Sequence, residues 1–83
     1  MHSVYKTYKT DKKYALLALY DASARLGYEI VSCNSSSGYL NIGVAAISLT
    51  QSPEGVDICV TSDKLDSDSA LALLDEVSAI LHD

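Results

Sequence analysis

The stretch YLNIGVAAISLTQSPEGVDICVT, residues 39–61, decides the fold because it holds two strand patterns and the turn between them. Pro53 presets the backbone angle φ of a turn residue, and Gly55 supplies a positive φ before the next strand. Residues 56–61 then alternate between apolar and polar side chains, which is typical of a strand with one buried face. This stretch therefore predicts an antiparallel hairpin with one face in the core.

Before the turn, the apolar residues change phase. Leu40 and Ile42 share one parity, whereas Ile47 and Leu49 share the other. A slip of one residue turns a strand inside out unless a bulge absorbs it. We therefore expect a bulge or bend within residues 43–46, or else two short strands that are separated there.

Residues 11–26, DKKYALLALYDASARL, predict a helix because Ala and Leu dominate and neither Pro nor Gly interrupts them. Thr10 or Asp11 can cap its start, and Gly27 fits the left-handed position after its end. At a period of 3.6 residues, one stripe is expected to face the core. That stripe consists of Ala15, Leu16, Leu19, Ala22, Ser23 and Leu26.

Two more elements complete the body of the chain. Residues 28–34 are rich in β-branched and aromatic side chains and predict a strand, followed by a polar turn at residues 34–38. A last helix is expected over residues 68–81, capped by Asp66 or Ser67.

The N-terminal segment repeats a tripeptide, Tyr-Lys-Thr, within residues 3–10. Its Tyr, Thr and Val residues favour a strand, and its lysines suit a sheet edge. We expect residues 4–9 to form an edge strand whose lysines meet the acidic last helix; the alternative is a disordered tail. Residues 1–3 are expected to be disordered.

These elements predict a single α+β domain over residues 1–83. The expected fold is a three- or four-stranded antiparallel sheet with two helices packed on one face, in the order (β)-α-β-β-β-α. A domain of 83 residues has little surplus stability, so a partner or a second copy would help it.

Charge and composition exclude several function classes. The net charge of −5 argues against nucleic acid or an anionic membrane as the main partner, and no apolar run is long enough for membrane insertion. The two histidines stand at positions 2 and 82, so a Ser-His or Cys-His nucleophile pair is not expected. Asp63, Asp66 and Asp68 lack the glycine and closing glutamate of a calcium loop. We predict a protein that is not an enzyme and has no metal or cofactor.

The element order is also that of double-stranded-RNA-binding domains, which place lysines at the start of their last helix. Here the same place reads Asp66-Ser67-Asp68, whose carboxylates repel phosphate, so we reject that function. Single-stranded nucleic acid remains an alternative, because the N-terminal region places rings beside cations. The residues concerned are Tyr5, Tyr8, Tyr14, Lys6, Lys9, Lys12 and Lys13.

The leading functional hypothesis is a protein-interaction or self-association module that uses the open sheet face or a sheet edge. That face is expected to carry a mixture of apolar and polar residues: Glu29, Val31 and Cys33, then Asp57, Cys59 and Thr61, with Tyr39 nearby. Leu17 and Tyr20 lie outside the core stripe of the first helix and are further candidates. A small-ligand site between helices and sheet is another alternative. Cys33 and Cys59 are either free thiols or one disulfide.

A resemblance adds to this interpretation. The run DKKYALLALYDASARLGYEIVSCNSSSGYLNIG, residues 11–43, has a helix that ends in Leu-Gly-Tyr, a strand, a polar turn, and a Gly that opens the next strand. It resembles small uncharacterised bacterial α-β-β-β-α domains of exported proteins and lipoproteins, which implies this fold and a non-enzymatic role. The chain lacks the lipobox or signal of such proteins. We therefore expect a cytoplasmic protein if the sequence is complete, and an exported one if a leading segment was removed.

Overall fold

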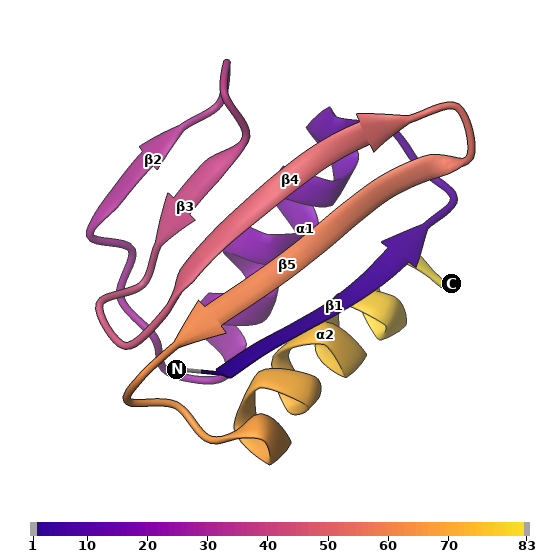
Figure 1. Ribbon diagram of the computed structural model, residues 1–83. Helices are drawn as coiled ribbons and strands as arrows, with labels where there is room; N and C mark the ends of the chain where they lie inside the picture. Colours follow the sequence, from indigo (N-terminus) through magenta and orange to yellow (C-terminus); the bar gives the residue numbers. More distant parts are fainter. Residues whose placement is uncertain (1, 83) are drawn as a thin grey trace.

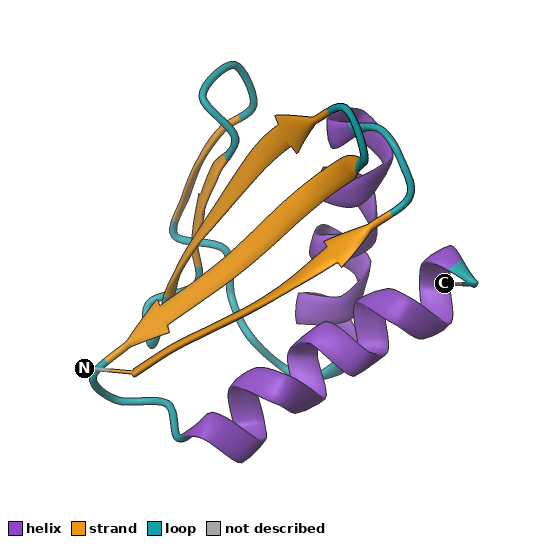
Figure 2. Ribbon diagram, turned by 45° about the vertical axis from the view of Figure 1, so that its right-hand side comes forward, coloured by secondary structure: helices purple, strands orange, loops and turns teal. Residues whose placement is uncertain are grey.

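The computed structural model describes residues 2–82, which form one antiparallel sheet and two helices (Figure 1). The elements are β1 (His2–Tyr8), α1 (Lys12–Arg25), β2 (Ser32–Asn34), β3 (Tyr39–Asn41), β4 (Ala46–Ser52), β5 (Gly55–Ser62) and α2 (Ser67–Leu81). The strand order is β1-β5-β4-β3-β2. Figure 2 shows both helices on the same face of the sheet, so the predicted α+β class and its layers are confirmed.

The sheet has five strands, not three or four, and the phase change explains one of the additional strands. Residues 39–52 form two strands, β3 and β4, so the alternative of two separated strands is correct. Gly43, with a φ of 83°, and a hydrogen bond from the Ile42 N–H to the Ala45 carbonyl shape the connection. The strand expected over residues 28–34 is shorter than predicted and begins only at Ser32.

The N-terminal segment is an edge strand. β1 pairs with β5 along its whole length, from His2 opposite Ser62 to Tyr8 opposite Val56. The expected disorder of residues 2 and 3 is therefore wrong, and Met1 lies outside the described residues. The prediction that a lysine meets the last helix is confirmed by Lys6, whose Nζ donates to Ser78 Oγ at 2.6 Å.

The predicted helix boundaries agree with the structure. Gly27 has a φ of 82°, and the Tyr28 N–H donates to the Ser23 carbonyl at 2.8 Å, which closes the end of α1. At α2, Asp66 Oδ1 accepts the Ser69 N–H at 2.7 Å, as predicted for a capping residue. Leu26, expected in the core stripe, is exposed because it stands at the turn that ends α1.

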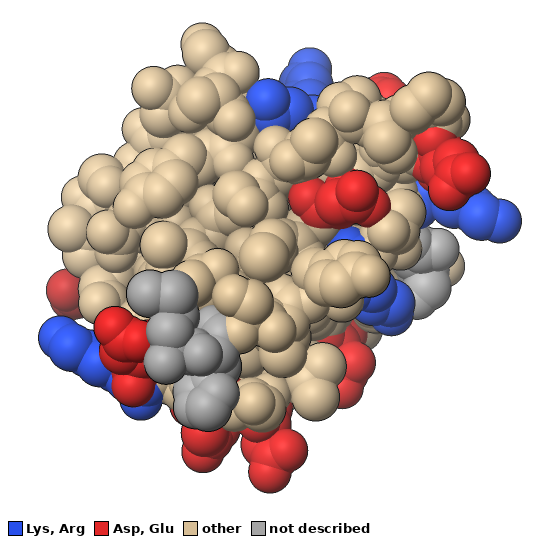
Figure 3. All heavy atoms as spheres, in the orientation of Figure 1, with Lys and Arg blue, Asp and Glu red and all other residues tan. Residues whose placement is uncertain are grey.

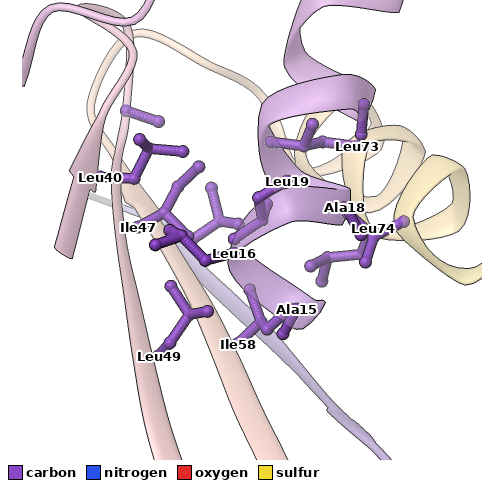
Figure 4. Close-up of a cluster of buried hydrophobic side chains, with 14 of the residues drawn as sticks. Ala15, Leu16, Ala18, Leu19, Leu40, Ile47, Leu49, Ile58, Leu73 and Leu74 are labelled. Atoms are coloured by element: carbon purple, nitrogen blue, oxygen red, sulfur yellow. The ribbon is translucent and has the colours of Figure 1, made fainter. Parts of the chain in front are cut away.

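The core lies between the sheet and the two helices (Figure 4). Leu16 and Leu19 of α1 contact the inward side chains of the sheet, while Ala18 allows α2 to approach α1 closely. The inward residues of the two central strands are fully or almost fully buried: Ile47 and Leu49 in β4, and Val56, Ile58 and Val60 in β5. The other face of these strands is not covered by any element within residues 2–82.

Candidate interaction surfaces

On the uncovered face of the sheet, the outward side chains form rows across the strands, and the strand register decides which residues share a row. One row of outward side chains crosses all five strands, because directly paired residues point to the same side. This row consists of Tyr5, Cys59, Ser48, Tyr39 and Asn34. We call the outward side chains of the five strands the open face. Tyr39 and Cys59, both predicted for this face, lie on either side of Ser48 in that row.

Charge is nearly absent from the open face. Among the outward residues of the described strands, Asp57 is the only Asp, Glu, Lys or Arg. Its Oδ1 accepts a hydrogen bond from the Thr7 hydroxyl at 2.5 Å. Figure 3, which looks onto this face, shows Lys, Arg, Asp and Glu gathered mainly around its margin. The remaining outward residues are Cys59, Ala46, two tyrosines, and small hydroxyl or amide side chains, so the face presents mainly neutral hydrogen-bonding groups.

The two tyrosines differ in how they are held. Tyr5 is 71% exposed. Tyr39 lies along its strand, since its hydroxyl accepts a hydrogen bond from Asn41 Nδ2 at 3.3 Å. Three strand spacings separate the two residues, which places them about 14 Å apart across the face.

Cys33 does not belong to the open face, contrary to the prediction. It pairs with Leu40, whose side chain is buried on the helix side, so Cys33 points to that side as well. The prediction assumed an unbroken strand from Tyr28, in which side chains alternate between the two faces. Because β2 begins only at Ser32, this alternation cannot be counted through residues 28–31. Cys33 and Cys59 therefore lie on opposite faces, and both are free thiols.

Cys33 instead joins the two predicted candidates on α1. A hydrogen bond with the Cys33 thiol, together with partial burial and the nearness of that thiol, raises the pKa of Tyr20 above its usual value. Leu17, one turn earlier on the same side of the helix, is 56% exposed. Val31 is also exposed and lies just before β2, beside Gly43. Of the predicted residues, Tyr39 and Cys59 thus lie on the open face, whereas Cys33, Leu17 and Tyr20 form a group along α1 and β2.

A hollow continues the second group towards the start of α1. It has a volume of about 260 Å³ and is lined by Lys12, Lys13, Leu16, Leu17 and Ser35. Lys12 Nζ also donates to the Ser36 carbonyl at 3.2 Å, which ties the turn after β2 to the helix. The sequence indicated Leu17 for protein interaction and Lys13 only for single-stranded nucleic acid, because only the fold brings the turn beside this end of the helix.

The N-terminal tyrosines and lysines do not share one surface. Tyr8 is fully buried, Lys6 reaches α2 on the helix side, and Tyr5 points the opposite way on the open face. A second hollow, of about 290 Å³, lies beside Gly43 and Asp63 at the end of the sheet. The first hollow lies between α1 and the turn after β2, and the second is lined by residues of neither helix.

Within residues 2–82, no three His, Cys, Asp or Glu side chains lie close enough together to hold a metal ion. Neither described helix has the length and apolar character needed to cross a membrane.

Comparison with known proteins yields no assignment: the chain matches no protein-family model, no curated protein and no solved structure. The resemblance to small exported bacterial domains therefore stays a prediction.

Proposed function

We propose that this protein is a non-enzymatic interaction module that binds a protein partner through its open face. The observation that carries the proposal is the combination of an uncovered five-stranded sheet with a nearly uncharged outer surface. An antiparallel sheet face that only meets water is free to carry Lys and Glu. Protein interfaces, in contrast, are depleted of charge at their centre and enriched in Tyr.

The size of the face sets the expected strength of binding. Five strands spaced about 4.8 Å apart, each up to about 20 Å long, offer on the order of 500 Å². A partner of equal footprint gives about 1,000 Å² of buried surface in total, which is at the lower limit of specific interfaces. We therefore expect a transient complex, in which Tyr5 and Tyr39 contribute most of the binding energy.

Site-specific photocrosslinking in the cells that naturally produce the protein tests this proposal. A photoreactive phenylalanine analogue replaces Tyr5 or Tyr39 on the open face, and Leu71 in the control protein. Leu71 is 46% exposed on α2 and is remote from that face. We expect a discrete protein adduct from positions 5 and 39 and none from position 71.

A substitution then checks the adduct. Ser48→Arg places a charge in the middle of the central row without disturbing the core, because Ser48 is exposed. It should abolish the adduct from position 39 while circular dichroism stays unchanged. Equal adducts from all three positions, or an adduct that survives Ser48→Arg, would contradict the proposal.

A further inference from the structure

The two edges of the sheet differ in how well they are protected against pairing with an additional strand. At the β1 edge, Lys6 points inward towards α2, a device that discourages the addition of another strand. At the other edge, no described strand pairs with the outer side of β2. Residues 31–35, Val-Ser-Cys-Asn-Ser, include no charge and no proline. Shortness is therefore the only feature of β2 that limits pairing.

The flank of α1 beside β2 adds side-chain surface to this edge. Lys13, Leu17, Tyr20 and Ala24 follow one another at helical spacing along that flank, and all four are exposed. Lys13 and Leu17 line one hollow together with Ser35, which directly follows β2, so the flank lies beside this edge. A strand added to β2 would consequently cover Leu17 and Tyr20 as well as satisfy the backbone edge.

We propose that the strand that occupies this edge is β2 of a second copy of the same chain. Antiparallel pairing of identical edges has twofold symmetry, the commonest symmetry of protein dimers. The register centred on Cys33 pairs all three residues of β2 with their counterparts. The product is a continuous ten-stranded sheet with the α1 helices of both copies on one side.

Charge complementarity favours a second copy as the occupant. Lys12 and Lys13 lie beside Ser35, at the end of β2, whereas the exposed Glu29 precedes its start. Antiparallel pairing reverses the two ends, so Glu29 of each copy approaches the lysines of the other. The symmetry supplies this attraction twice, which offsets part of the cost of association.

The contact is small. Three paired residues and one helix flank on each copy bury on the order of 1,000 Å² in total, so the dimer is expected to dissociate in the micromolar range or above. The inference is independent of the proposed function, because the open face stays uncovered in this dimer and is doubled in extent.

Sedimentation velocity of the full chain under reducing conditions, from about 10 µM to about 1 mM, is the first test. We expect reversible dimerisation that Leu17→Glu weakens at least about tenfold, since it places a charge in the contact. Leu71→Glu, the same change at an exposed leucine of α2, should leave it unaltered. A monomer throughout this range, or equal effects of both variants, would overturn the inference.

Charge reversal tests the pairing register. Lys13→Glu and Glu29→Lys should each weaken the dimer about threefold to tenfold, and the double variant should restore it. Both residues are exposed, so the variants keep the fold. If the losses of dimer affinity in the two single variants instead add up in the double variant, the antiparallel arrangement is contradicted.

Crosslinking locates the twofold axis. A short bis-maleimide reagent should link wild-type chains and the Cys59→Ser variant, but not the Cys33→Ser variant, because Cys33 is opposite its own counterpart. Linking that requires Cys59 instead would overturn the inference. Ser48→Arg on the open face should leave the dimer intact, which separates this result from a failure of the proposed function.

Discussion

Replacing Tyr8 by Phe removes one hydroxyl that ties the N-terminal strand to the last helix. The ring is fully buried, and its hydroxyl donates to the Leu74 carbonyl at 2.7 Å. The substitution keeps the ring and deletes only the oxygen, so the change in the free energy of unfolding reports mainly on this bond.

The structure sets the size of the loss. A buried hydrogen bond of this kind contributes about 1 kcal/mol, and a carbonyl left without a partner would cost up to about 3 kcal/mol. The Leu74 carbonyl keeps a partner, since it also accepts the Ser78 hydroxyl at 3.1 Å. We therefore expect a loss of about 1 kcal/mol, which corresponds to a fall in Tm of about 4–8 °C for a domain of this size.

Urea unfolding followed by circular dichroism measures the loss. The midpoint should fall by about 0.5–1 M with an unchanged m value. Tyr5→Phe is the matched control on the same strand, because Tyr5 is exposed, and it should change the free energy of unfolding by less than about 0.5 kcal/mol. Equal stability of the Tyr8→Phe and Tyr5→Phe proteins would refute the docking of β1 against α2.

Two further predictions concern local geometry. Gly55 has a φ of 144°, and a Cβ there would meet the Tyr8 carbonyl oxygen, so Gly55→Ala should cost roughly 2–4 kcal/mol in urea unfolding. Gly27→Ala, with open space around it at a φ of 82°, should cost only about 1 kcal/mol, and equal costs would contradict this account. Cys33→Ala should lower the pKa of Tyr20 towards its usual value in an NMR titration. Because the fold raises this pKa, the bond stabilises the protein below about pH 10 and is lost as the hydroxyl ionises; an unchanged pKa would exclude the bond.

The sequence predicts those parts of the fold, the turns and the helix ends, that depend on the backbone preferences of neighbouring residues. Pro53 and Gly55 indicate the β4–β5 turn, Gly27 indicates the end of α1, and Asp66 indicates the start of α2. Each signal depends on the backbone preference of one or two residues, and such preferences act whatever the rest of the chain does.

The candidate surfaces were predicted less well because they depend on distant parts of the chain. The side to which Cys33 points is set by its pairing with Leu40, and parity counted from Tyr28 fails where the chain leaves strand geometry before Ser32. The central row of the open face joins Tyr5 to Cys59, and only the β1–β5 register reveals that pairing. Tyr39 and Cys59 were placed correctly because the strands that carry them alternate without interruption.

The pairing of β1 with β5 has a consequence for the order of folding. Val4 lies opposite Val60, so β1 stays unpaired during synthesis until β5 has been made. The β4–β5 hairpin closes over a short turn and is able to form well before it. β1 thus stays exposed until its partner strand forms, and Lys6 is the residue of β1 that discourages its pairing with other chains during that interval.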